Sequence, residues 1–598
     1  MAKYTADFET STPAWLIRDK ETRVWAWAIH EIGGDDFKYG NSIDTFFEWC
    51  FKDKRKNHTL YFHNLKFDGE YIIYYLLSNG YEVVQTKNEV HDKSFVCLIS
   101  NTGQFYSIEI YKRAGKYPNK ITLYDSMKIF NFSVDKVAKG FDLPLSKLEL
   151  DYNTYREVGH QLTEHEVEYI LHDVKIMALA LDTMFKEGLK KMTIAGDAIN
   201  YYKSTLSDFK FYFPVLSKQI DDDVRESYKG GFTYLNPLYK EKDIKRDIIV
   251  LDSNSMHPSH MMNDWMPIGT PEYYQGEYQY DPLYPLYICR ISCSFEIKKG
   301  KIPSIQLKKT RGFIPTEYIE TTNGEIVTLT LTSVDYELFR MQYNITSKLI
   351  FHDGYKFKRL KGLFSSYINY WIERKTNAKK DGNKALYTIT KLMLNSLYGK
   401  FGLNPKVQGK YPVIEDDKIR YHLYPEEIRD SVYCPVASFI TSYSRYDIIT
   451  TSQAIRDYSL KTYGEDYYIY SDTDSIHMIK LTDEELANII KMDDYKLGYY
   501  KRESEAVRGI YIRQKCYLEI DKDGNMNTTV AGLPKKLGKY VTVENFKKGF
   551  SIKASEEDKE HKLAFKHVKG GVLLVDTDFT IKEWKRLYVK QTNHILIL

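Results

Sequence analysis

Apolar residues along the chain recur with two spacings, and segments of each kind alternate. Residues 465–470 and 475–481 are rich in aromatic and β-branched side chains, as strands are, and residues 248–251 form a short apolar run. Apolar residues after Thr163 and Glu166, which match a helix capping box, instead follow helical spacing. The alternation predicts mixed α/β domains, and 598 residues are enough for several of them.

Composition places the chain among ordinary soluble globular proteins. Charged residues make up 28% and hydrophobic residues 43%. No apolar stretch reaches membrane length, and the first ten residues lack an apolar signal segment, so we expect a cytoplasmic protein without membrane association. Of six scattered cysteines only Cys289 and Cys293 lie close in sequence, and no second pair completes a zinc site. We expect reduced thiols in the core.

The distribution of charge is more informative than the net charge of +4. Basic stretches with aromatic or apolar neighbours occupy residues 51–58, 297–312, 372–384 and 532–540. Grooves that bind nucleic acid combine cations that neutralise phosphates with rings that stack on bases. For each stretch alone, a solvated lysine-rich face explains the sequence equally well.

Asp472 and Asp474 stand one residue apart, between the two predicted strands 465–470 and 475–481. A hairpin would put both carboxylates at its tip, and residues two apart in a strand project to the same side. Converging carboxylates are tolerated where a divalent cation lies between them. A calcium loop fits poorly, because its sixth and twelfth positions would be His477 and Asp483 instead of glycine and glutamate. An isolated pair of this kind is most often a polar turn.

A third carboxylate follows the apolar run 248–251, at Asp252. With the hairpin, it gives two strands that present carboxylates to a common point. Asp252 and Asp474 could bridge two magnesium ions with Asp472 in support, an arrangement suited to nucleotidyl transfer.

Between these acids lies a basic helix. Lys384, Lys391, Asn395 and Tyr398 are separated by seven, four and three residues, which puts all four on one helical face, and glycines then end the helix. A lysine face beside a metal site suits a triphosphate. A basic amphipathic helix that packs on its leucines is the alternative for the helix taken alone.

The N-terminal third holds a separate set of acids. Asp7 and Glu9 share one face of a predicted strand, and Asp68 lies in apolar sequence. Tyr169 and Asp173 are four residues apart on the predicted helix after Thr163. The four carboxylates could hold two metal ions about 3.5–4 Å apart for phosphodiester hydrolysis, with the tyrosine orienting the attacking water. Each acid alone would be read as a surface residue.

Here the sequence resembles a known family. The segments DFET, FHNLKFDG and YILHD are similar to the three motifs of the DEDD-type 3′–5′ exonuclease domain of DNA polymerases. Two further segments, YDSMK and SKLELDY, strengthen the resemblance. It implies that Asn64, Ser126 and Met127 contact the DNA and that Lys147 assists hydrolysis.

The second set of motifs resembles family B DNA polymerases. Motifs A, B and C are matched, in the correct order, by LDSNSMHP, KLMLNSLYG and YSDTDS. The residues within these motifs resemble those of the protein-primed group from small linear-genome bacteriophages, the phi29 type. YKGGFTYLN, TSYSRY and RQKCY match accessory segments. The residues implied in DNA binding are Tyr228, Gly230, Gly231, Thr441, Arg445, Lys515 and Tyr517. Lys375 and His257 are implied in nucleotide binding, and Ser253 is implied as a further metal ligand.

The resemblance implies a multidomain α/β and α+β fold: an RNase H-like exonuclease domain followed by a right-hand polymerase domain of palm, fingers and thumb. The implied divisions are exonuclease 1–189, palm 190–264 and 435–530, fingers 363–401, thumb and tail 531–598, and two insertions, 265–362 and 402–434. The first insertion is implied to contact the priming protein and downstream DNA, and the second to give processivity and strand displacement. The tail 583–598 is unassigned.

The implied function is replication of a linear viral genome from a protein primer, with 3′–5′ proofreading. Each active site would use two Mg²⁺ ions, and Mn²⁺ should also support activity. The implied partners are template-primer DNA, deoxynucleoside triphosphates and a terminal protein. We expect a monomer in the cytoplasm of a bacterial host.

Three rival interpretations fit less of the chain. A stand-alone repair exonuclease would need only about the first 190 residues. A reverse transcriptase would carry two adjacent aspartates in its hairpin and no N-terminal nuclease motifs. A non-catalytic replication scaffold would not need both sets of carboxylates.

His257 departs from the family pattern, which has a tyrosine that lies under the deoxyribose and excludes a 2′-hydroxyl. An imidazole is smaller and can hydrogen-bond a hydroxyl. We expect a weakened gate that still prefers deoxynucleotides. Two alternatives remain: the backbone alone keeps the ring close enough to block ribose, or His257 only packs and Tyr398 or a neighbour selects the sugar.

Overall fold

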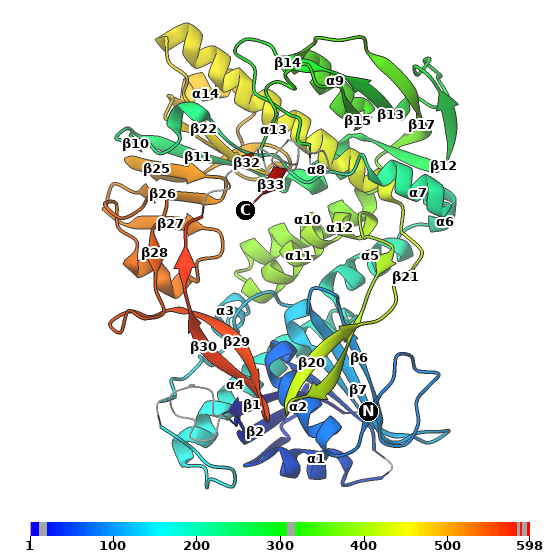
Figure 1. Ribbon diagram of the computed structural model, residues 1–598, viewed down its shortest axis with the longest axis vertical. Coiled ribbons are helices and arrows are strands. Elements are labelled where there is room, and N and C mark those ends of the chain that lie inside the picture. The colour runs from blue at the N-terminus through cyan, green and yellow to red at the C-terminus, as the bar shows by residue number, and fades with distance from the viewer. Residues whose placement is uncertain are drawn as a thin grey trace.

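The computed structural model describes residues 2–10, 21–54, 56–152, 154–307 and 317–582, and the backbone of two short strands, β32 (Arg586–Tyr588) and β33 (Ile595–Ile597). Part of the basic stretch 297–312 and most of the tail after 582 therefore lie outside the described residues. Figure 1 shows the N-terminal domain at the bottom, in blue and cyan, and most of the remaining elements above it.

The N-terminal domain is built on an eight-stranded sheet. Its strands are β1 (Lys3–Thr10), β2 (Val24–Glu31), β3 (Phe37–Gly40), β4 (His58–Phe62), β5 (Glu82–Val83), β6 (Ser94–Ile99), β7 (Phe105–Arg113) and β8 (Asn119–Asp125). Their order is β3-β2-β1-β4-β8-β7-β6-β5, with β1, β4 and β8 parallel. The helices are α1 (Ile43–Phe51), α2 (Leu65–Ser78), α3 (Val134–Gly140) and α4 (Glu164–Lys186). The predicted capping box at Thr163 is present at the start of α4.

Alternation along β1 decides which side chains meet which helix. Tyr4, Ala6 and Phe8 belong to the core cluster that includes residues of α1 and α2. The opposite face packs on α4, where the Thr5 hydroxyl donates to the Val174 carbonyl at 2.7 Å. Because side chains alternate along a strand, Asp7 and Glu9 must also face α4.

A second large sheet, called the palm sheet below after the division that the sequence implies, has five antiparallel strands in the order β24-β11-β23-β22-β9. Its strands are β9 (Thr233–Leu235), β11 (Ile248–Ser253), β22 (Tyr468–Asp472), β23 (Ser475–Ile479) and β24 (Tyr500–Ala506). The long helix α13 (Cys434–Tyr463) packs on this sheet. The predicted strand before Asp252 and the predicted acidic hairpin are thus confirmed, and the sheet places them side by side.

The central helices lie between the palm and the N-terminal domain (Figure 1). They are α5 (Ile194–Ser204), α10 (Ser365–Lys380), α11 (Lys384–Ser396) and the short α12 (Tyr398–Phe401). The predicted basic helix therefore breaks at Leu397, although that residue keeps helical backbone angles (φ −72°, ψ −49°). Asn395 and Tyr398 still face the same side because the interruption is so slight.

The remaining elements form smaller units. Residues 265–362 hold the sheet β12-β17-β13-β15, made of β12 (Trp265–Gln275), β13 (Leu286–Cys293), β15 (Val327–Thr332) and β17 (Ile350–Lys361), with α9 (Ser333–Gln342). The C-terminal part has the sheet β10-β25-β26-β27, made of β10 (Asp243–Ile244), β25 (Arg508–Arg513), β26 (Cys516–Ile520) and β27 (Met526–Val530). All six cysteines are buried and unpaired, as expected. In the described part of the chain, no helix has the length and apolarity that crossing a membrane requires.

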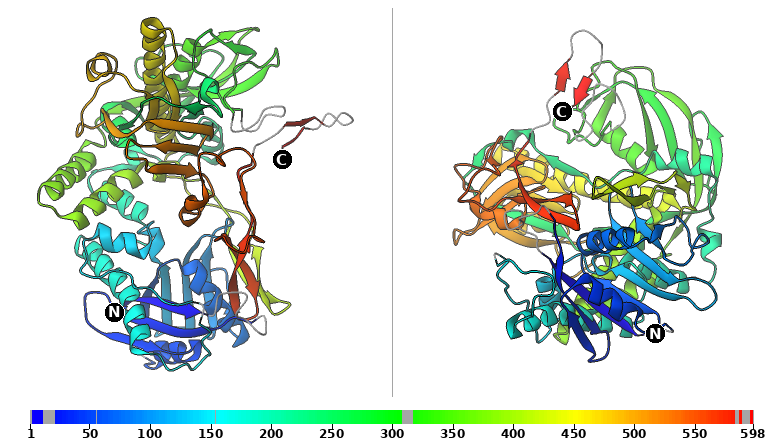
Figure 2. Two further views of the ribbon diagram at one scale, coloured as in Figure 1. Left: turned by 90° about the vertical axis from the view of Figure 1, so that its left-hand side faces the viewer. Right: turned by 60° about the horizontal axis from the view of Figure 1, so that its bottom comes forward.

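Helix α2 and two hairpins, three segments far apart in sequence, lie in contact with one another. The hairpin β19 (Lys410–Glu415) and β20 (Lys418–Leu423) places the Tyr421 hydroxyl 2.8 Å from the buried Glu70 carboxylate, to which it donates. The hairpin β29 (Lys562–Val568) and β30 (Gly571–Thr577) accepts a 2.7 Å hydrogen bond from Tyr71, through the carbonyl of Val572. Figures 1 and 2 show both hairpins, yellow-green and red-orange, beside the blue domain. The two contacts link the N-terminal domain to two segments of the chain that lie more than 300 residues beyond α2.

Candidate catalytic sites

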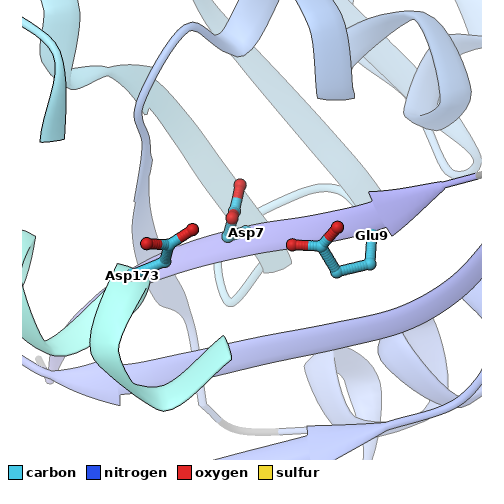
Figure 3. Close-up of side chains that lie close together, drawn as sticks. All are labelled: Asp7, Glu9 and Asp173. Carbon is cyan, nitrogen blue, oxygen red and sulfur yellow. The ribbon is translucent and has the colours of Figure 1, made fainter. Parts of the chain in front are cut away.

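The N-terminal carboxylates come together on the face of β1 that packs on α4. Carboxylate oxygens of Asp7, Glu9 and Asp173 lie within 4.8 Å of one another, close enough to share a metal ion. Figure 3 shows Asp7 and Glu9 projecting from one strand toward Asp173 on the neighbouring helix. Asp7 and Asp173 also line a small cavity of about 110 Å³ with His63 and Lys147.

Electrostatics in this cluster favour a bound cation. Burial and the charge of Asp173 raise the pKa of Asp7 to about 7. Burial and the charge of Asp7 raise the pKa of Glu9 and of Asp68 well above their usual range. Among the described residues, one oxygen each of Asp68 and Asp173 is buried without a hydrogen-bond partner. Divalent cations prefer such oxygen ligands, so the residues present fit a metal site.

Lys147 and Tyr169 flank the acids. The Lys147 ammonium lies 2.6 Å from the Asp173 carboxylate, so it neutralises that acid. The Tyr169 hydroxyl shares a 2.6 Å hydrogen bond with Tyr152, and burial and the charge of Glu9 raise the pKa of Tyr169, which therefore stays a neutral phenol. Sequence reasoning missed Tyr152, although it closes the quoted SKLELDY segment.

The predicted DNA contacts near this site differ in exposure. Asn64 is exposed, with left-handed backbone (φ 76°), and its N–H donates to the Asp125 carboxylate at 3.1 Å. Met127 is half-buried. Ser126 is fully buried and donates to the Phe62 carbonyl at 3.0 Å, so its hydroxyl is engaged inside the protein. Asn64 and Met127 are therefore the members of this group that DNA could reach.

The second site lies where β11 meets the tip of the β22–β23 hairpin. Asp252 is paired with Ser475 in the sheet, and the Ser253 N–H donates to the Asp474 carbonyl at 2.8 Å. A cavity of about 370 Å³ opens beside Asp252 and Asp474. Its other predicted lining residues are Ser253, His257, Lys375, Lys391, Asn395 and Tyr398. The structure thus brings Asp252, Asp474 and two of the predicted lysines to one cavity.

The paired acids favour a cation here too. Burial and the charge of Asp252 raise the pKa of Asp474 to about 6. The Lys501 ammonium lies 3.1 Å from the Asp252 carboxylate, so one of the two acids is already paired with a positive charge. Both observations fit Mg²⁺, a hard cation that binds carboxylate oxygens. Ser253 is buried next to these acids, which is compatible with the predicted ligand role.

Asp472 requires a correction. Its carboxylate does not line the cavity; it lies 2.6 Å from the Lys515 ammonium and accepts a hydrogen bond from Thr233 at 3.1 Å. The prediction that Asp472 and Asp474 project to the same side is wrong, because Thr473 between them has left-handed backbone (φ 63°) and breaks the strand alternation. Asp472 therefore orders Lys515 at the hairpin tip.

Lys384 also lies elsewhere than predicted. Its ammonium pairs with Asp142 of the N-terminal domain at 2.7 Å, and it does not line the cavity. Lys375, from α10, does line it, and burial and the charges of Lys391 and Lys501 lower the pKa of Lys375. Sequence reasoning missed Lys501, Glu503 and Tyr387, which also line the cavity.

Arg445 and Thr441 are interior residues. Arg445 is 4% exposed, pairs with Asp335 at 2.6 Å and donates to the carbonyls of Lys229 and Gly230 at 2.9 and 2.8 Å. The Thr441 hydroxyl bonds within its own helix. The predicted direct contact with the template is thus not available to either side chain, because both are buried. Arg445 instead positions the 228–231 segment.

That segment fits closely against the hairpin and the central helices. A Cβ at Gly231 would lie 2.8 Å from the Thr473 side chain, and a Cβ at Gly402 would lie 2.6 Å from the Tyr228 ring. Glycine is therefore required at both positions. At the other predicted DNA contact, Tyr517 is half-buried against the Tyr470 ring, with centroids 5.5 Å apart.

His257 stacks on Tyr398 in the floor of the cavity. The ring centroids are 4.1 Å apart and the planes differ by 13°. Burial, followed by the charge of His260, lowers the pKa of His257 to about 4, so the imidazole is neutral at physiological pH. A neutral imidazole has one donor and one acceptor nitrogen.

Comparison with known proteins agrees with this architecture. Residues 50–491 match the family model described as DNA polymerase type B, organellar and viral. The DNA polymerase of Bacillus phage Nf is 41% identical over 97% of this chain and 99% of its own length, and that of Bacillus phage phi29 is 40% identical with the same coverage. The solved structure of phi29 DNA polymerase with primer-template DNA and incoming nucleotides has a TM-score of 0.87 at 38% identity, covering 97% of this chain and all of that one.

The fold, the two carboxylate sites and these likenesses define the class: the chain belongs to the family B DNA polymerases of organellar and viral type. Within that family it is a DNA-directed DNA polymerase of the phi29 type. The expected fold, an exonuclease domain joined to a right-hand polymerase domain, is confirmed.

Proposed function

We propose that this polymerase copies a linear phage genome from a protein primer, proofreads with its N-terminal site and displaces the non-template strand. The observation that carries the proposal is the presence of two separate carboxylate sites in one chain, each with a raised carboxyl pKa. Solved relatives hold primer-template DNA with nucleotides, or single-stranded DNA, which supports the same ligands here.

At the polymerase site, Asp252 and Asp474 would hold Mg²⁺, with Ser253 as a further ligand. Bound there, Mg²⁺ would supply activation of the primer 3′-hydroxyl and stabilisation of charge on the phosphates. Lys391 and Lys375, on the opposite wall, donate charge-assisted hydrogen bonds to the triphosphate, and Asn395 lies on the same wall. The stacked rings of His257 and Tyr398 form the floor under the sugar.

At the exonuclease site, Asp7, Glu9, Asp68 and Asp173 would hold two metal ions, which would supply activation of water and stabilisation of the leaving oxygen. Tyr169, kept neutral and fixed by Tyr152, orients the attacking water. Lys147 balances the charge of Asp173. Asn64 and Met127 would position the frayed 3′ end.

Protein priming is proposed from the full-length likeness to phage polymerases. Its test is transfer of a labelled deoxynucleotide to the candidate terminal protein of the same genome, without any oligonucleotide primer. Absence of such transfer by an enzyme that extends oligonucleotides normally would contradict it. The proposal places the enzyme, as a monomer, in the cytoplasm of the infected bacterium.

Strand displacement and processivity are proposed to depend on the junction at α2, because it links the 402–434 insertion and the C-terminal hairpin β29–β30 to the N-terminal domain. Tyr421→Ala removes the hydrogen bond to Glu70, and a bond to a charged group contributes about 1.5–3 kcal/mol. Replication of a primed single-stranded circle should then yield shorter products, with about ten-fold fewer molecules passing one full circuit.

Tyr411→Ala is the matched control for Tyr421→Ala. It removes a half-buried tyrosine of the same hairpin whose ring contacts are with His422 and Tyr424 of the hairpin itself. Equal product lengths for the parent enzyme and for Tyr421→Ala would contradict a role for the junction.

His257→Tyr should raise the ratio of dNTP to rNTP incorporation efficiency by about ten-fold or more, because the larger ring fills space under C2′ of the sugar. Single-nucleotide insertion kinetics with matched dNTP and rNTP measure this ratio. His257→Phe separates ring size from the added hydroxyl. An unchanged ratio, with ordinary dNTP kinetics, would show that position 257 does not select the sugar.

A further inference from the structure

Lys501 is a cation at the polymerase site that no sequence motif indicated. Strand β24 pairs with β11 so that Lys501 is directly opposite Asp252, and residues paired in this way project from the same face of the sheet. The Lys501 ammonium lies 3.1 Å from the Asp252 carboxylate. A proposed metal ligand is therefore already neutralised by a side chain of the palm.

The position of Lys501 relative to the other lysines is the second observation. Lys375 and Lys391 reach the cavity from helices α10 and α11, whereas Lys501 reaches it from the palm sheet. Its side chain is 36% exposed, so its flexible stem retains room to move. Glu503, two residues further along β24, also lines the cavity and adds an acid near the same wall.

We propose that Lys501 exchanges partners during each nucleotide addition. Before metal binding, Lys501 pairs with Asp252. When Mg²⁺ binds with the nucleotide, Asp252 becomes a metal ligand, and the Lys501 ammonium leaves Asp252 and binds the phosphate chain. The triphosphate is then held between Lys375 and Lys391 on one wall and Lys501 on the other. This inference rests on the proposed polymerase site.

The charges explain why Lys501 has a favourable partner both before and after the metal ion binds. Without a metal ion, an unpaired Asp252 beside Asp474 would leave two neighbouring carboxylates to repel each other, and Lys501 prevents this. With the metal ion bound, the carboxylate no longer needs an ammonium, and a triphosphate offers Lys501 stronger charge-assisted hydrogen bonds. When pyrophosphate and its metal leave, Lys501 can return to Asp252.

The test is Lys501→Met in an Asp7→Ala, Glu9→Ala background, which removes metal binding at the exonuclease site. Lys480→Met is the matched control. Lys480 is 37% exposed and pairs at 2.9 Å with Glu505, which lies on β24 as Lys501 does, but Lys480 does not line the cavity. Mn²⁺ binding to the free protein is titrated by electron paramagnetic resonance. Binding of the next dNTP is titrated separately, on a dideoxy-terminated primer-template with Ca²⁺.

Lys501→Met should bind Mn²⁺ more tightly, because no ammonium competes for Asp252. It should bind the dNTP about ten-fold more weakly, because a charged phosphate contact is lost. Lys480→Met should match the background protein in both titrations. Lys391→Met should weaken dNTP binding without tightening Mn²⁺ binding, since it contacts only the phosphates.

Tighter Mn²⁺ binding with unchanged dNTP affinity would overturn the exchange and leave Lys501 as a fixed counterion of Asp252. Unchanged Mn²⁺ affinity would overturn it as well. If Lys391→Met and Asp252→Asn also leave the dNTP affinity intact, the failure lies in the proposed polymerase site itself.

Discussion

Asp252→Ala and Asp474→Ala should each reduce dNTP incorporation by about a thousand-fold or more while degradation of single-stranded DNA continues. Metal ions stabilise transition-state charge by several kcal/mol, and either change removes a carboxylate that would hold them. The two acids lie together on the palm sheet, whereas Asp7 and Glu9 lie on β1 of the separate N-terminal sheet. Primer extension and single-strand degradation, measured on the same preparation, separate the two activities.

Asp483→Ala is a suitable control because this exposed acid of the palm pairs with Arg502 and does not line the cavity. It should leave both activities near those of the parent enzyme. Near-normal incorporation by either Asp252→Ala or Asp474→Ala would refute the assignment of the metal site.

The mirror result is expected for the double change Asp7→Ala and Glu9→Ala. Degradation in the 3′–5′ direction should fall by about a thousand-fold or more, since two of the clustered acids are lost, while primer extension continues. The measurement is release of nucleotides from the 3′ end of a labelled single strand.

Asp135→Ala serves as the comparison in the N-terminal domain, because this acid pairs with Lys139 on α3 and is not one of the clustered acids. If the double variant degrades DNA at a rate comparable with the parent, the nuclease site lies elsewhere. Loss of primer extension as well would indicate that the two sites do not act independently.

The carboxylate sites could be predicted because they depend on local periodicity. Asp7 and Glu9 face α4 because strand alternation is regular there, and Asp252 ends a strand that the apolar run already indicated. The same rule failed at Asp472, since the rule assumes extended backbone and Thr473 is left-handed. One residue with φ of 63° was enough to separate two side chains that the spacing had placed together.

Other errors came from contacts between distant parts of the chain. Helical spacing put Lys384 on the face of Lys391, but seven residues correspond to about 10 Å along a helix, which carries Lys384 out of the cavity. Its partner Asp142 belongs to another domain. Arg445 is buried because Asp335, 110 residues earlier in the sequence, supplies a carboxylate for it. Only the folded arrangement reveals such partners.

The meeting of three segments at α2 has a consequence for engineering this polymerase. Helix α2 belongs to the N-terminal domain, yet it is the surface on which both hairpins rest. Deletion of that domain to obtain an enzyme without proofreading would also remove the helix to which both hairpins are hydrogen-bonded. A useful error-prone version must therefore be made by point substitution, because editing and long-range synthesis depend on the same domain.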